Sequence, residues 1–528
     1  MKKILLYSIV MVLLAGFTGC NDWLDINQDP NNLTSSTKEL VLTGAQKQFA
    51  ERQQIGSSGG YAALYGAWIG YYGHSGGWSG WNDVKSYNMT SSGYNADFND
   101  PYRAELKSLQ YVKDAAEEEG SFGYVAISKI LTAATYQRLV DTYGDIPYSE
   151  AVGGFDGEVT PIYDDAQEIY EDLVMQLDSA IIYLNMAGEN AQTIDETSDI
   201  IGGGDLEYWK QIANTFKLRV LMRLSEFNDG YVSSNMTFDD AGFITSSVTA
   251  NPGYIDNTTD KMNPIYETYG KNTSGDLTNA NQQYGLNIFL STLYKSTSDP
   301  RLELCWEPGV DTEDYSHALQ LGQNGDPLDH WGSGSVRMGP GIYGGTTNGD
   351  VIVLSIMEAD FLIAEALARG YNLSSAGVTA TAEESWEEGI LESMLYYGSR
   401  KGLESDSIQT LYDFYIEGLS GPSAWDAANP VRSIIYQKYV AMVGVNHYEA
   451  YADYRRTGYP EPGNPSEIET SMISYYNNII RAQVPVRMLY PQRELDINAE
   501  NVNAAITKTG VTYNSDFIMD AKIFWDVN

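Results

Sequence analysis

The segment Tyr124–Ala151 limits most strongly what this chain can fold into. Its first twenty residues are apolar on nearly every side, and a helix with such a surface has to be central rather than superficial. Gly144 stands where the C-terminus of that helix is expected, and Pro147 prevents the helix from continuing. The segment therefore predicts a buried helix over Tyr124–Tyr143 that ends in a tight turn.

Apolar residues recur at helical spacing on both sides of this segment, which predicts a mostly α protein built from antiparallel helix pairs. Further helices are predicted at Ser36–Gln54, Asp100–Glu119, a segment that starts at Thr160-Pro161, Tyr208–Phe227, Val351–Arg369, Ala382–Tyr397 and Val431–Val445.

Residues 229–350 form a different kind of segment, rich in Gly, Asn, Thr, Ser and Asp, with short apolar runs. Long loops, short elements and a few short strands are expected there, and loops carried by a rigid scaffold are where binding sites tend to lie. No linker rich in Pro and Ser divides the chain. We therefore expect one domain over 36–528, with a helical scaffold at about 36–228 and 351–528 and a loop-rich insertion at about 229–350.

Composition narrows the function. The formal net charge of −39 repels phosphate backbones and argues against a nucleic-acid partner. The 40 Tyr residues far outnumber the 14 Phe residues, and Tyr and Trp suit half-wet surfaces that bind ring-bearing or extended polar ligands. The alternative is that a high Tyr content is common in secreted proteins and has no role in binding.

Cysteine content excludes two kinds of site. With Cys20 and Cys305 as the only cysteines, no disulfide framework or Cys-based zinc site is expected.

The N-terminus has the pattern of a lipoprotein export signal. A short basic start precedes the apolar run Ile4–Leu14, which is too short to span a bilayer and fits a signal-peptide core. Small residues then lead to Cys20, as in the lipobox of bacterial lipoproteins, although Phe17 replaces the usual aliphatic residue. We predict a signal peptide at 1–19, lipid attachment at Cys20 and a tether at 20–35. The alternative is an ordinary signal peptide that happens to contain a cysteine.

Aromatic and glycine residues crowd the segment Tyr61–Trp81. Within it, residues 73–77 spell G-x-S-x-G, the pattern of a nucleophile elbow, which would make Ser75 a hydrolase nucleophile. The following Gly-Trp-Ser-Gly-Trp is a poor helix start, so we favour a ligand platform in which glycines let the backbone approach and aromatic faces cover the ligand. A buried packing loop is the alternative without a binding role.

Several segments in a fixed order resemble the SusD/RagB family of nutrient-binding outer-membrane lipoproteins. They are YGDIPYSEA at 143–151, WKQIANTFKLRVLMRLS at 209–225, DPRL at 299–302, EADFLIAEALARG at 358–370, QKYVAMVGVNHYEAYADYRRTGYP at 437–460 and VPVRMLYPQRELDIN at 484–498. Together with the lipobox they cover essentially the whole mature chain.

The resemblance implies a SusD-like fold, in which tetratricopeptide-like helix pairs carry an irregular region with the ligand site. It implies a lipid-anchored position on the outer membrane, facing the cell exterior, and no catalysis. It also implies a partner, a SusC-like TonB-dependent transporter, which the lipoprotein covers as a lid and supplies with captured nutrient. A Ca²⁺ ion occurs in this family, but the sequence places no ligands for one, and no other cofactor is expected.

The resemblance implies an oligomeric nutrient as the ligand, and we favour an oligosaccharide over an oligopeptide. Glycan-binding members use an arc of aromatics, and the candidates in this sequence are Tyr72, Trp78, Trp81, Trp306, Trp331 and Tyr343. A tetratricopeptide adaptor without a small ligand, and a secreted hydrolase using Ser75, are the hypotheses from other classes.

Polar residues of the matching segments could suggest active-site charge, but we favour buried pairing of arginine with carboxylate between helix pairs. The residues that mark the family in this way are Arg138, Tyr143, Gly144, Asp145, Pro147, Arg219, Glu365, Arg455 and Arg456.

Overall fold

A computed structural model describes residues 36–54, 61–75, 80–153, 159–309, 314–322, 334–467, 469–476, 479 and 481–528. Helix accounts for 54% and strand for 5% of the structure, which confirms the mostly α prediction. The signal peptide, Cys20 and the tether lie outside the described residues, as do two of the aromatic candidates, Trp78 and Trp331.

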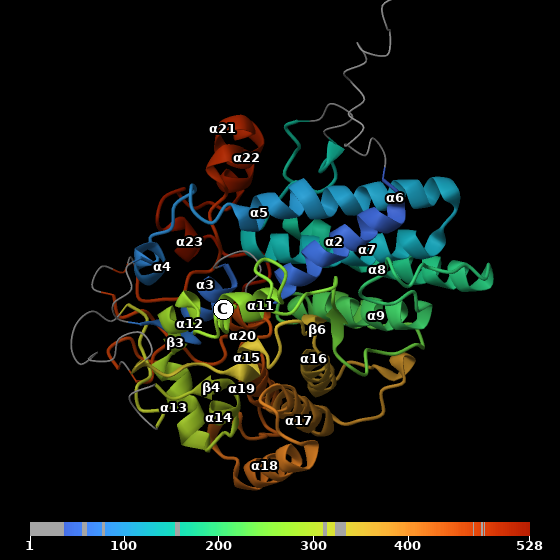
Figure 1. Cartoon of the computed structure of the whole chain (residues 1–528). Helices are drawn as coiled ribbons and strands as arrows, with labels where there is room; N and C mark the ends of the chain where they lie inside the picture. Colours follow the sequence, from blue (N-terminus) through green and yellow to red (C-terminus); the bar gives the residue numbers. More distant parts are fainter. Residues whose placement is uncertain are drawn as a thin grey trace, which may run out of the picture.

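The first half of the scaffold is a series of long helices, each packed against the next (Figure 1). They are α2 (Lys38–Gln53), α6 (Lys107–Glu119), α7 (Phe122–Tyr143), α8 (Ala166–Glu189) and α9 (Leu206–Arg223). The helix α7 is central as predicted, since it contacts α6, α8 and α9 and buries most of its residues.

The second half of the scaffold packs onto α9 through α16. Its helices are α16 (Ile356–Ala368), α17 (Ala382–Arg400), α18 (Ser405–Gly418), α19 (Pro430–Ala441) and α20 (His447–Thr457), followed by α21 (Gln492–Ile497), α22 (Ala499–Lys508) and α23 (Phe517–Asp520). Short helical turns lie at η5 (Ser374–Ala376) and η6 (Gly421–Ser423).

The region between the two halves carries short helices and short strands joined by turns and loops. Its elements are α10 (Asp229–Asn235), β2 (Val248–Ala250), α11 (Pro264–Tyr269), α12 (Asn279–Gln283), β3 (Tyr284–Leu286), α13 (Ile288–Thr297), α14 (Arg301–Cys305), β4 (Trp306–Glu307), β5 (Arg337–Met338) and α15 (Pro340–Tyr343). The early segment contributes α3 (Tyr61–Trp68), β1 (Tyr72–His74), α4 (Asn82–Ser86), α5 (Ala96–Asp100) and the π-helical turn η2 (Pro101–Leu106).

Two small antiparallel sheets join distant parts of the chain. The larger has the strand order β1-β3-β5-β4, and its β1 and β3 pair Tyr72 with Leu286 and His74 with Tyr284. The smaller pairs β2 with β6 (Val351–Leu354). The early aromatic segment is thereby fixed to the insertion.

Two helices begin five or six residues later than the sequence predicts. The helix predicted from Thr160-Pro161 begins at Ala166, where the Asp165 carboxylate accepts hydrogen bonds from the amides of Gln167 and Glu168. Pro161 stays in the loop, where its carbonyl accepts from the Asn498 amide at 2.8 Å.

The other difference lies at the start of the helix predicted over Val351–Arg369. Its first four residues form β6, because β2 offers them a strand partner, and the helix α16 begins after Ser355. The Ser355 hydroxyl accepts from the Glu358 amide and caps α16.

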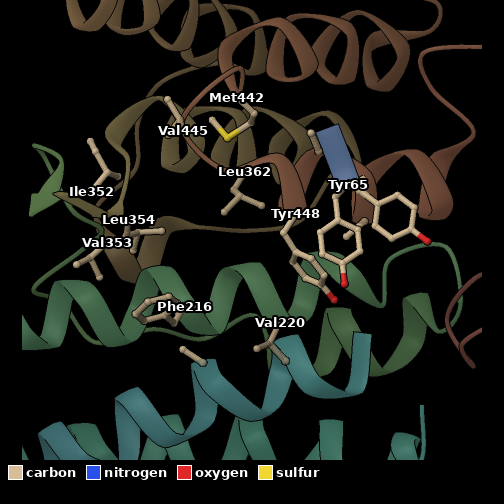
Figure 2. Packing of buried hydrophobic residues seen from close by; sticks show 14 of the residues in the cluster. Tyr65, Phe216, Val220, Ile352, Val353, Leu354, Leu362, Met442, Val445 and Tyr448 are labelled. Carbon is tan, nitrogen blue, oxygen red and sulfur yellow. The ribbon is translucent and has the colours of Figure 1, made fainter. Parts of the chain in front are cut away.

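The core runs through both halves of the scaffold. Figure 2 shows Phe216 and Val220 of α9 in one cluster with Leu354 of β6 and Leu362 of α16, and Tyr65 and Tyr448 lie beside one another. The rings of those two tyrosines meet edge to face at 5.2 Å.

The C-terminal end of the chain also enters this core. Trp525 has no exposed surface, and its indole N–H donates to the Asp141 carboxylate of α7 at 2.7 Å. The same carboxylate accepts from the Arg223 guanidinium of α9 at 3.2 Å. The last residues therefore belong to the scaffold itself.

Candidate functional site

Three aromatic side chains meet where β1 and β3 end. The Trp81 ring lies 4.5 Å from the Tyr284 ring at an interplanar angle of 30°, and 5.8 Å from the His74 ring. Trp81 is half-buried, whereas His74 and Tyr284 are buried. We call His74, Trp81 and Tyr284 the aromatic cluster; its exposed part is the remaining surface of Trp81.

His74 of the aromatic cluster has a polar neighbour and a charged neighbour. The Gln283 side-chain amide lies 2.9 Å from the His74 Nε2 atom. Burial, and next the positive charge of Lys85, lower the pKa of His74 to about 4. His74 is therefore neutral at physiological pH and can offer hydrogen bonds without a charge.

Close packing behind the aromatic cluster explains one of the glycines of the GHSGG motif. A Cβ atom at Gly73 would lie 2.3 Å from Leu319 Cβ, so no larger residue fits without displacing the segment that carries Leu319. Strand β1 can therefore lie against residues from the insertion only because position 73 is glycine.

Ser75 does not have the setting of a hydrolase nucleophile. Its residue is 1% exposed, and its amide donates to the Gln283 carbonyl at 2.8 Å. A nucleophile elbow instead presents its serine at the open tip of a strand-to-helix turn. Here Ser75 follows the strand β1 as part of the sheet edge.

Two aromatic candidates from the sequence lie in the core. Tyr72 of β1 and Trp306 of β4 have no exposed surface, and their rings lie 5.9 Å apart. The Tyr72 hydroxyl is 3.0 Å from the His447 Nε2 atom. In this conformation neither ring offers a face to a ligand.

Tyr343 lies in a different place from the aromatic cluster. Its ring packs edge to face against Tyr266 at 5.6 Å, and it lines a cavity of about 230 Å³ together with Asn263 and Arg400. The structure therefore separates the candidates: Trp81 belongs to the aromatic cluster, Tyr343 to this cavity, and Tyr72 and Trp306 to the core.

Sequence reasoning missed His74, Gln283 and Tyr284 as neighbours of Trp81. Gln283 and Tyr284 lie about two hundred residues from Trp81 in the chain, and only the β1–β3 pairing brings them together. The GHSGG motif did contain His74, but its pattern pointed to a hydrolase instead.

Most of the residues that mark the turn after α7 hold the scaffold together. Arg138 donates to the carbonyl of Arg52 and to the Asp97 carboxylate at 3.3 Å. Asp145 accepts from the Ala166 amide at 2.9 Å and pairs with Lys508 at 2.8 Å.

The backbone of the turn after α7 is also fixed, by the conformation of a glycine and by hydrogen bonds to carbonyl groups. Gly144 ends α7 with a φ of 78°, a conformation that favours glycine. The carbonyl of Tyr143 accepts from Arg487, and that of Pro147 accepts from the Tyr102 hydroxyl at 2.7 Å.

The remaining marked residues form buried ion pairs or carbonyl contacts between helices. Arg456 of α20 donates to both carboxylate oxygens of Glu365 in α16, at 2.5 and 2.7 Å. Burial acts to raise the pKa of Glu365, but Arg456 and Arg369 outweigh it, so that pKa is lowered. Arg455 donates to the carbonyls of Asp141 and Val486.

The described residues hold no group of three or more His, Cys, Asp or Glu side chains arranged for a metal ion. Among the helices in the same ranges, none combines the length and apolar character that crossing a bilayer requires.

Comparisons with known proteins agree on one family. A SusD-like family model, described as "Starch-binding associating with outer membrane", matches residues 30–491. A SusD homolog from Bacteroides uniformis superposes with a TM-score of 0.72 at 23% identity, over 92% of this chain and 99% of that one.

Two chitin-binding proteins are also similar in structure. A chitin-binding SusD homolog from Flavobacterium johnsoniae has a TM-score of 0.69 at 22% identity, over 92% of this chain and 99% of its own. Another structure named a chitin-binding protein has a TM-score of 0.72 at 22% identity, over 93% and 100% of the two chains. A comparison with curated proteins finds no match.

Proposed function

The chain belongs to the SusD-like family of outer-membrane nutrient-binding proteins, and on this basis we propose that it captures an oligomeric glycan outside the cell and delivers it to a SusC-like TonB-dependent transporter. Members of the family are non-catalytic binding proteins, and the buried position of Ser75 fits that role better than hydrolysis. An oligopeptide is the alternative nutrient.

The aromatic cluster is the observation that carries the glycan proposal. A half-buried Trp81, backed by Tyr284 on one side, presents rigid apolar surface of the kind that covers the face of a sugar ring. The chitin-binding names of two similar structures add support for a glycan over a peptide. Tyr343 remains a second candidate contact.

The proposal includes a lipid anchor at Cys20 that holds the protein on the outer membrane. Acylation of Cys20 would give the chain two or more acyl chains, which hold a protein stably on a membrane where one chain does not. The tether at 20–35 would then connect the lipid to α2, with the binding region outside the cell.

The ligand is tested by titration calorimetry of the mature chain with chito-oligosaccharides, malto-oligosaccharides and oligopeptides. We expect one glycan series to bind and Trp81→Ala to weaken it by about tenfold, the equivalent of about 1.4 kcal/mol. Trp425→Ala is the matched control, because Trp425 is also half-buried and packs against another aromatic, Trp386, at 5.5 Å. Binding of peptides alone would replace the glycan with the alternative nutrient.

The transporter is tested by co-purification. We expect the tagged lipoprotein, expressed in its own host, to bring down a large outer-membrane barrel. Recovery without any barrel would contradict the partner. A barrel complex that binds neither glycan nor peptide would instead favour an adaptor without a small ligand.

A further inference from the structure

A groove of about 570 Å³ opens between η2, α21 and the turn that follows α7. Its lining is largely apolar, with Phe98, Tyr102, Pro147, Val159 and Ile497 among the members. Val159 is 72% exposed and Ile497 is 54% exposed, so this apolar surface is open to solvent. Neighbouring exposed apolar side chains of this kind mark a surface that binds something.

Positive charge surrounds the groove in a protein that is otherwise strongly acidic. Arg103, Lys107 and Arg493 line it, and all three are exposed. Arg103 is paired with Asp100 at 2.9 Å, yet its side chain is still 77% exposed. The whole chain has only 32 Lys and Arg against 71 Asp and Glu, whereas the lining of this groove holds these three cations against two carboxylates, Glu150 and Glu494.

The carboxylates of the groove are already engaged within the protein. Glu150 accepts from the Ile162 amide at 2.9 Å, and Glu494 accepts from the Tyr163 hydroxyl at 3.0 Å. The groove therefore suits an occupant that combines apolar side chains with carboxylates.

We propose that the occupant is the chain's own tether, residues Asp22–Asp29. This segment reads DWLDINQD and carries three apolar side chains among three aspartates. Leu24 and Ile26 are two residues apart, so an extended segment directs both toward the same side, while Asp25 and Asp29 project from the opposite side. Pro30 favours an extended conformation for the residue before it.

The point where the described chain begins lies within reach of the groove. The Tyr111 hydroxyl donates to the carbonyl of Ser36 at 2.5 Å, which fixes the start of the domain beside α6. Lys107 is four residues before Tyr111 on the same helix, about 6 Å along its axis. The seven Cα-to-Cα steps from Asp29 to Ser36 can extend over roughly 23 Å, which is more than this span.

Covalent attachment also favours the tether over a free partner. A segment on a short connection experiences an effective concentration on the order of millimolar, so weak contacts suffice to keep it bound. With Cys20 acylated, a bound tether would direct the η2 and α21 face toward the membrane.

Hydrogen exchange on the lipid-free mature chain, in which Cys20 is replaced by Ser, tests this proposal. We expect the amides of residues 23–29 to exchange about tenfold or more slowly than an unstructured chain. Arg103→Glu with Lys107→Glu should abolish that protection. Lys261→Glu with Lys271→Glu is the matched control, because both lysines are exposed and lie in the insertion, and it should leave the protection unchanged.

Exchange of residues 23–29 at the unstructured rate, or protection that survives Arg103→Glu with Lys107→Glu, would overturn the proposal. Protection of α21 that rises with protein concentration would also overturn it, by assigning the groove to a second copy.

Cysteine cross-linking gives a readout that does not depend on charge. Ile26→Cys with Ile497→Cys should form a disulfide readily under mild oxidation. Ile26→Cys with Phe414→Cys is the control, because Phe414 is 76% exposed on α18, which lies at the opposite end of the molecule from α21 (Figure 1). Equal rates of cross-linking in the two pairs would contradict docking in the groove.

Discussion

Arg219 of α9 and Glu358 of α16 form a buried ion pair with two parallel hydrogen bonds, at 2.7 and 2.9 Å. Both side chains are at least nine-tenths buried, and the pair joins the first half of the scaffold to the second. Arg223, one turn further along α9, continues the contact to Glu449 of α20 at 2.5 Å.

Breaking the Arg219–Glu358 pair on one side should cost far more stability than replacing both partners. Arg219→Met leaves the Glu358 carboxylate buried and uncompensated, and we expect the free energy of unfolding to fall by about 3–5 kcal/mol. Arg219→Met with Glu358→Leu should cost clearly less. Denaturant titrations of the three proteins measure both values, and a double variant as unstable as the single one would contradict this view.

Asp360 should make the protein less stable as pH rises. Burial, and next the charges of Glu388 and Glu392, raise the pKa of Asp360 to about 8. Because the pKa in the folded state lies above the unfolded value, the associated stability is complete below pH 4 and is lost between pH 4 and 8, by at most about 5 kcal/mol.

Comparison with Asp360→Asn isolates this contribution of Asp360 from other carboxylates. The variant should match the parent near pH 4 and exceed its unfolding free energy at pH 8. A parent that stays as stable as the variant at pH 8 would show that Asp360 ionises without cost.

The stability that depends on His74 should be lost as pH falls, in contrast to that of Asp360. Its pKa of about 4 lies below the ordinary value, because burial disfavours the imidazolium. Acidification from pH 6.5 to 4 therefore protonates the unfolded chain before the folded one and removes up to roughly 3 kcal/mol of stability. The difference in unfolding free energy between parent and His74→Gln should shrink over that range and level off below pH 4. A difference that is constant with pH would contradict the lowered pKa.

Gly73→Ala should destabilise the protein by about 1–3 kcal/mol, since the added methyl overlaps Leu319 and the sheet has to shift. Gly418→Ala is the matched control, because no atom lies within 4 Å of an added Cβ there. At that position the loss of chain freedom in the unfolded state should leave stability equal or slightly higher. Thermal unfolding compares the two variants, and equal midpoints would exclude the overlap.

Helical periodicity and capping residues explain why much of the scaffold could be predicted from the sequence. The helix before Gly144 and the cap at Gly120 depend on residues that are neighbours in the chain. The strand β6 could not be predicted, because Val351–Leu354 also continues a helical pattern and only its partner β2 decides the outcome.

The aromatic cluster was even harder to predict from the sequence, because its members come from distant parts of the chain. Tyr72 and Trp81 come from the same Gly-rich and aromatic segment, yet one is core and the other is half-exposed. That outcome follows from the pairing of β1 with β3, more than two hundred residues away, which no local pattern contains. Composition predicts a surface of Tyr and Trp side chains, but it does not say which of these rings would be exposed.

The contact of Trp525 with Asp141 has a consequence for how this protein folds. The two residues are 384 positions apart, so this part of the core forms only once segments that are very distant in the chain have come together. Closing so long a loop costs conformational entropy before the contact gives anything in return. Contacts of this kind slow folding, and we therefore expect the packing of Trp525 onto α7 to be a late step.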